Sequence, residues 1–203
     1  MKRLIALAAL LPITALAQES NETSYDYFDF NYFGNNWDLG PSSLDGSGYA
    51  GRLSVELRDH LFMMADYSVW DFDGVSGSSA QKDFGLGVHF DLGKRWSIFG
   101  GGGVRTLDLD LGAGKSQEEN AFITGGARLQ VADGYEIRVS ADYADLTPVR
   151  SGETSVTVGG DIYLTDVIAL SLDFNLNDDD TTTFMVGMRF YHKKDTSNLR
   201  KRR

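Results

Sequence analysis

The chain has 203 residues, a formal net charge of −10 and no cysteine. Its length fits one domain, and the lack of cysteine excludes disulfides and thiolate-bound metals. The acidic balance argues against nucleic acid as a partner, because phosphate binding needs clustered Lys and Arg.

The first 17 residues predict a secretory signal peptide. Two basic residues precede an apolar run over residues 4–16, and Ala15 and Ala17 supply the small residues of a cleavage site before Gln18. A basic start, a short apolar run and an A-x-A site are typical of export signals. A membrane-spanning helix would need about 18 residues or more. We therefore expect export through the Sec pathway, cleavage before Gln18 and a short lead over residues 18–23.

Ten segments that alternate apolar and polar residues follow. We expect strands at about residues 24–33, 48–57, 61–72, 82–92, 96–107, 120–131, 135–145, 154–164, 167–176 and 181–191. A tilted strand crosses a bilayer with about 9–11 residues. Short turns at one end alternate with longer connections at the other, which is typical of outer-membrane barrels. The first segment changes its alternation between Tyr27 and Phe28, which predicts a β-bulge there.

Each segment has an apolar face and a polar face that carries charge in mid-strand. A soluble barrel turns the apolar face inward and a membrane barrel turns it outward. Aromatic residues near both strand ends favour the membrane barrel, because such bands lie at the two membrane interfaces. The expected bands are Tyr32, Phe33, Tyr49, Trp70, Phe72 and Tyr143 at the long-connection end, and Phe90, Trp96, Tyr135 and Phe190 at the short-turn end.

We therefore predict an all-β protein, a closed antiparallel transmembrane β-barrel over residues 24–191. Ten strands are expected, with eight as the alternative. The polar faces would then line the lumen and form a nearly balanced charge network, because a buried charge without a partner costs several kcal/mol. Its expected members are Arg52, Glu56, Asp66, Asp91, Arg105, Arg128, Glu136, Arg138, Asp142, Asp161, Asp173 and Arg189. Side chains just fill a small barrel, so we expect a nearly plugged lumen, with a narrow ion-conducting pore as the alternative.

The two ends of the barrel carry a resemblance. The last strand ends in Val186-Gly187-Met188-Arg189-Phe190, which resembles the C-terminal signal of outer-membrane β-barrels. With the opening Ser24-Tyr25-Asp26-Tyr27 and the glycine-rich hairpins, it is similar to small barrels of the OmpX/Ail-like group in the broad sense. Such barrels usually stop at the aromatic residue, whereas residues 192–203 continue as a basic tail that we interpret as disordered or as a periplasmic extension. The resemblance implies that the barrel-assembly machinery recognises Phe184, Val186, Gly187, Met188 and Phe190.

Motifs for catalysis or ligand binding are weak. Residues 112–116 look like the end of a phosphate-binding loop, but Leu109 stands where its first glycine is required. The three histidines, His60, His89 and His192, all lie toward the short-turn end, so none is available to activate a nucleophile at the outer rim. We expect no catalysis, no cofactor and no metal, although the acidic loops could bridge to lipopolysaccharide phosphates through divalent cations.

The predicted function is a structural or surface-interaction role in the outer membrane. The expected partners are outer-membrane lipid, lipopolysaccharide and, during biogenesis, the barrel-assembly machinery, and the barrel is expected to be monomeric. A small pore or transport protein is the second hypothesis, and a lipid- or peptide-modifying enzyme is the third. A soluble periplasmic ligand-binding barrel is the fourth and would need its apolar faces to point inward.

Overall fold

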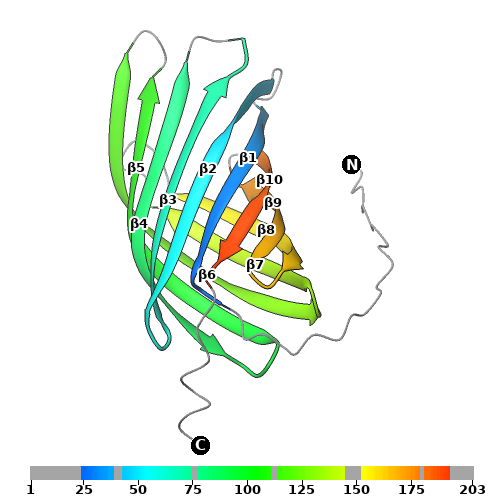
Figure 1. Ribbon diagram of the computed structural model, residues 1–203. Helices are drawn as coiled ribbons and strands as arrows, with labels where there is room; N and C mark the ends of the chain where they lie inside the picture. Colours follow the sequence, from blue (N-terminus) through cyan, green and yellow to red (C-terminus); the bar gives the residue numbers. More distant parts are fainter. Residues whose placement is uncertain are drawn as a thin grey trace, which may run out of the picture.

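The computed structural model describes residues 24–38, 43–74, 77–110, 114–144, 152–178 and 181–192. They form ten antiparallel strands in one closed barrel, in which each strand pairs with its neighbours in sequence and β1 pairs with β10 (Figure 1). In the described residues no helix is long and apolar enough to cross a membrane. The predicted fold class is therefore confirmed, with ten strands rather than eight. The strands are β1 Tyr27–Asp38, β2 Ser43–Arg58, β3 Leu61–Phe72, β4 Ser78–Asp91, β5 Trp96–Asp110, β6 Lys115–Ala132, β7 Tyr135–Ala144, β8 Glu153–Thr165, β9 Ile168–Asn177 and β10 Thr181–Tyr191.

Several strands run further into the long connections than the alternation predicts. β2, β4, β5 and β6 have 14–18 residues, whereas β7, β9 and β10 have 10 or 11, and the longer strands form the taller wall of the barrel (Figure 1). Backbone pairing does not require apolar side chains, so the hairpins continue where the outer face becomes polar. On that extended wall Lys82 of β4 and Asp108 of β5 form an outward ion pair with an N–O distance of 2.7 Å.

The bulge predicted in β1 is wrong. The register of β1 is continuous with both β2 and β10. Aromatic residues occupy both faces of this strand, with Tyr27 and Phe33 inward and Phe28 and Phe30 outward, so the apparent change of alternation is two overlapping patterns. Register shifts occur instead beside three of the short turns, between Glu56 and Arg58, Gln130 and Ala132, and Tyr163 and Thr165.

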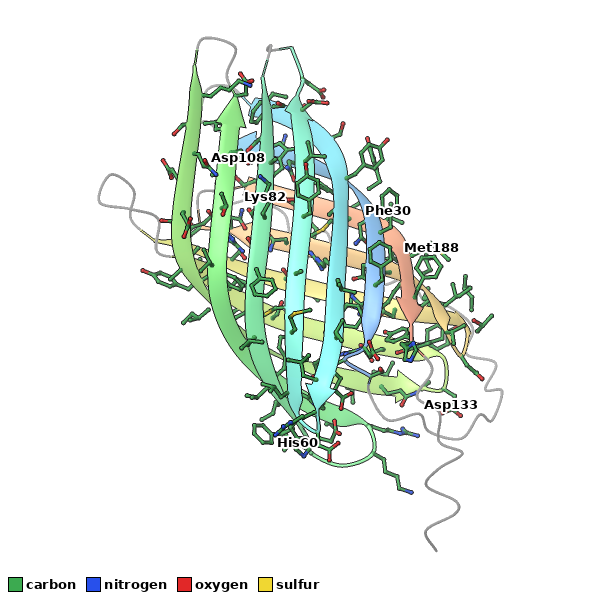
Figure 2. The ribbon with its side chains drawn as sticks, turned by 60° about the vertical axis from the view of Figure 1, so that its left-hand side comes forward. Phe30, His60, Lys82, Asp108, Asp133 and Met188 are labelled. Carbon is green, nitrogen blue, oxygen red and sulfur yellow. The ribbon has the colours of Figure 1, made fainter. Side chains whose placement is uncertain are left out.

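The outer face of the barrel is apolar and exposed. Phe30 of β1 and Met188 of β10 are paired neighbours on this face, and Figure 2 shows them between the Lys82–Asp108 pair and the turn residues His60 and Asp133. An exposed apolar face around a polar interior is the arrangement of a membrane barrel and the reverse of a soluble one. The exposed apolar residues of this face include Phe84, Leu86, Phe90, Ile123, Val139, Val158, Leu172, Phe184 and Phe190.

The aromatic band at the long-connection end differs from the predicted one. Phe33 and Phe72 are buried, and Trp70 packs inside the barrel against Phe33 with ring centroids 6.2 Å apart. These three residues share the inward parity of their strands, because each lies an even number of positions from a charged inward residue. The exposed outward band at this end consists of tyrosines, namely Tyr32, Tyr49, Tyr67 and Tyr143.

Candidate functional site: the charged interior of the barrel

Asp161 of β8 is the centre of the buried charge network. It accepts hydrogen bonds from Arg189 Nη1 and from the Tyr191 hydroxyl, each at 2.8 Å, and forms an ion pair with Arg138. Arg189 also donates through Nε and Nη2 to the two carboxylate oxygens of Asp29, both at 2.6 Å. Charge-assisted bidentate pairs are the strongest hydrogen bonds in proteins, and this one joins the first strand to the last.

The network continues to the opposite wall. Arg138 Nη2 donates to Asp173 at 2.7 Å, and Arg52 Nη1 donates to the other oxygen of Asp173 at 3.3 Å. Arg52 also pairs with Asp66 at 2.9 Å between Nε and Oδ1. Side chains from β7, β9, β2 and β3 are thus connected across the lumen.

A second branch lies nearer the short turns. Arg128 donates to both oxygens of Glu136, at 2.7 and 3.1 Å. The Tyr163 hydroxyl oxygen lies 3.3 Å from Glu136 Oε2 and 3.1 Å from the Tyr191 hydroxyl oxygen, so its one proton can be donated to either. Since Tyr191 also contacts Asp161, this branch and the centre form one network.

The remaining predicted members lie outside this connected set. Arg105 forms a separate bidentate pair with Asp83, with its shortest N–O distance at 2.8 Å. Asp142 lies on the inward face of β7, opposite Thr124 and Ser155, and Glu56 Oε1 lies 4.0 Å from His89 Nε2. The prediction for Asp91 is wrong, because this last residue of β4 is exposed and is not buried in the charge network.

Two buried acidic residues were missed by the sequence analysis. Asp83 shares the inward parity of His89, so the alternation of β4 contained the signal. Asp29 was obscured by the bulge that we placed in β1. Its Cα is paired with Arg52 on β2 and with Arg189 on β10, which puts a carboxylate between two arginines.

The lumen is filled around the buried charges near the short turns and open to water around the Arg52–Asp66 pair. Asp29, Arg128, Glu136, Asp161 and Arg189 are 0–3% exposed. A continuous aqueous channel past these residues would leave wall side chains accessible to water, so the lumen is filled where they lie. The side chains of Arg52 and Asp66 are 28% and 35% exposed. Water therefore reaches this ion pair from inside the barrel, since both residues face the lumen.

The proposed assembly-signal residues lie on two faces of β10. Phe184 and Phe190 are exposed on the outside, and Val186 and Met188 share that parity. Gly187 faces inward next to Asn31, whose amide oxygen would lie 2.2 Å from any Cβ at that position. Their role in assembly stays a prediction. Ala15, Ala17 and Gln18 of the predicted cleavage site and residues 193–203 of the tail lie outside the described residues.

In the described residues no group of three or more His, Cys, Asp or Glu side chains could hold a metal ion. His60 and His89 lie together near the short turns, with ring centroids 5.5 Å apart. The charged part of the interior consists of arginine–carboxylate pairs with tyrosine hydroxyls beside them.

Comparison with known proteins identifies the fold but not the function. No protein-family model and no curated protein matches the sequence. Among solved structures, the NanC porin is 9% identical, with a TM-score of 0.51, covering 81% of this chain and all of that one. The KdgM porin (10% identity, TM-score 0.46, 81% of this chain and 99% of that one) and Neisserial surface protein A (13%, 0.41, 83% and 98%) are also similar. The likeness to NanC shows the barrel fold, and the finer resemblance to the OmpX/Ail-like group stays a prediction.

Proposed function

We propose that the protein is an integral outer-membrane barrel with a structural or surface-interaction role and a lumen closed in its short-turn half. The observation that carries this proposal is the inverted polarity of the wall, with exposed apolar side chains outside and paired charges inside. In water such an exposed belt would associate, whereas in a bilayer it meets lipid tails. The predicted signal peptide supports export. Membrane lipid, lipopolysaccharide and the barrel-assembly machinery are the proposed partners, and no catalytic role is proposed.

The filled interior favours a closed barrel over a conducting one. Arg128, Arg189, Glu136, Asp29 and Asp161 occupy the lumen as buried pairs. Opening a channel through them would separate charges whose pairing offsets several kcal/mol of desolvation per ion. A small pore is the second candidate function, because water already reaches Arg52 and Asp66 from inside the barrel.

Cell fractionation and heat-modifiable gel migration test the membrane placement. We expect the protein in the outer-membrane fraction, with a folded band that shifts on boiling. Recovery as a soluble periplasmic protein would refute the proposal. Planar-bilayer recordings test the closed lumen, because large and steady conductance from the unmodified protein would favour the pore.

A matched pair of substitutions tests which surface faces lipid. Leu172→Arg places a charge on the exposed apolar face of β9, and Asp71→Arg places it on an exposed outward position near the end of β3. Arg near the bilayer midplane costs about 2–4 kcal/mol, and near the interface about 0–1 kcal/mol. We expect Leu172→Arg to lower the urea midpoint in liposomes and Asp71→Arg to leave it nearly unchanged. Equal midpoints for both would contradict the membrane placement.

A further inference from the structure

Part of the lumen wall is built from glycines. In the short-turn half, β4, β5 and β6 present Gly87, Gly101 and Gly126 to the interior, and rings from β3 and β5 lie over two of these glycines. A Cβ at Gly87 would lie 2.3 Å from the Phe62 ring, and a Cβ at Gly126 would lie 2.8 Å from the Phe99 ring. Rings therefore cover this part of the wall, whereas the ion pairs around Asp161 fill the side of the lumen formed by β7–β10 and β1.

One ring in this group does not come from a barrel strand. Tyr25 precedes β1, yet it is 3% exposed. Its ring stacks on His89 with centroids 4.1 Å apart and an interplanar angle of 15°, and on Phe62 at 5.0 Å. The Arg128 guanidinium carbon lies 4.8 Å from the same ring centroid. Tyr25 thus occupies the gap between the ring-filled side and the charged side.

Residues 24–26, which we call the plug segment, are tied to the barrel by polar contacts from three strands and from His192, the residue after β10. The Tyr25 hydroxyl and Ser97 Oγ are 2.8 Å apart, and Ser54 Oγ donates to the Tyr25 carbonyl at 2.5 Å. Arg128 Nη1 donates to the Ser24 carbonyl at 2.8 Å, and the His192 amide donates to the Asp26 carbonyl at 2.9 Å. All four contacts could be released without breaking any strand pair between Tyr27 and Tyr191.

We propose that the plug segment is a removable closure of the short-turn mouth, and that its withdrawal opens a path for water and small ions. Withdrawal would uncover Ser97, His89 and one face of Arg128, which are polar and would hydrate. The path would lead between the rings that cover the glycines and the buried ion pairs, toward the water-accessible Arg52 and Asp66. Because no strand pair from Tyr27 onward involves the segment, the barrel stays folded when the mouth opens. This inference rests on the proposed membrane placement.

Conductance in planar bilayers tests the closure. The proteins compared are the unmodified chain, Tyr25→Ala and the control Tyr32→Ala, which removes an exposed outward tyrosine from β1. We expect Tyr25→Ala to raise the mean conductance at least tenfold and Tyr32→Ala to leave it unchanged. Equal conductance of Tyr25→Ala and the unmodified chain, whether both are open or both closed, would overturn the inference. If Tyr25→Ala loses its heat-modifiable band, Tyr25→Val replaces it in the same comparison.

Thiol labelling gives a second readout, because the chain has no cysteine of its own. Ser97 is fully buried beneath Tyr25, whereas Ser116 is exposed on β6. We expect Ser97→Cys to react at least tenfold faster with a water-soluble maleimide when Tyr25→Ala is also present, and Ser116→Cys to react equally in both backgrounds. Unchanged labelling of Ser97→Cys in a folded, inserted barrel refutes the plug alone, whereas failure of the unmodified chain to insert refutes the proposed function.

Discussion

Replacing Arg189 with methionine is the sharpest test of the buried network. Arg189 is 1% exposed and serves two carboxylates, Asp29 and Asp161. Methionine keeps much of the side-chain length and removes the charge. Asp161 keeps Arg138 and the Tyr191 hydroxyl, whereas both oxygens of Asp29 lose the donors they accept from.

The expected cost follows from that difference. Removing one partner of a buried ion pair typically destabilises a protein by about 3–5 kcal/mol, because the other charge stays buried without compensation. Asp29→Asn alone should cost less, about 1–3 kcal/mol, since Arg189 still pairs with Asp161. The double variant Arg189→Met/Asp29→Asn no longer buries a bare carboxylate at position 29. It should therefore be more stable than Arg189→Met by roughly 1–3 kcal/mol.

Urea titration in detergent micelles, followed by tryptophan fluorescence and the heat-modifiable band, measures these differences. The slope against urea should stay constant, so that midpoints report stability. Arg105→Met is the matched control, because the Arg105–Asp83 pair is more exposed, at 16% and 8% of the side chains, and should cost less. A double variant as unstable as the sum of the two single variants would refute the argument that a bare buried charge causes the loss.

Two further predictions concern backbone positions. Gly87→Ala should destabilise the barrel by about 1–3 kcal/mol, because its Cβ would overlap the Phe62 ring. Gly125→Ala is the control and should be nearly neutral, because the nearest atom to a Cβ there is 3.6 Å away. Equal urea midpoints for the two variants would contradict this prediction. His60 has φ of 70°, which glycine adopts without the cost of about 1–2 kcal/mol that other residues incur. His60→Gly should raise the thermal unfolding midpoint, and a lower midpoint would mean that the stacking of His60 on Phe90 outweighs the backbone strain.

The strands were predictable because apolar and polar residues tend to alternate along a strand whose outer face is apolar and whose inner face is polar. The prediction for residues 61–72 agrees with β3 at both ends because polar turn residues, Asp59 and Asp73, flank the strand, although apolar and polar residues alternate only over residues 65–69. The taller wall was not predictable in the same way. Beyond the apolar belt the outer face becomes polar, as at Lys82 and Asp108, while Trp70 and Phe72 pack inside. An aromatic residue near a strand end can therefore point either outward or into the lumen. Only its parity relative to charged inward residues of the same strand shows which.

The sequence predicts that these charged side chains point into the lumen, but it does not predict which of them form ion pairs with one another. Alternation places Arg189 and Asp161 in the lumen, but they lie on β10 and β8, with β9 between them. Ala169 is the residue of β9 paired with Arg189, and its small side chain, which is fully buried, leaves room for the guanidinium to cross. Such pairings depend on the stagger between strands around the barrel, which a single sequence does not reveal.

The Arg189–Asp29 ion pair, which joins β10 to β1, helps to fix the register in which these two strands pair. A slip of one residue between β1 and β10 would turn Arg189 toward lipid, so the alternation already excludes it. A slip of two residues keeps every side chain on its own face and leaves the apolar belt intact, so burial alone does not exclude it. It would, however, move Arg189 away from Asp29 and leave a buried charge without its bidentate partner. The buried ion pair thus selects the register of closure among alternatives that the alternating pattern treats as equivalent.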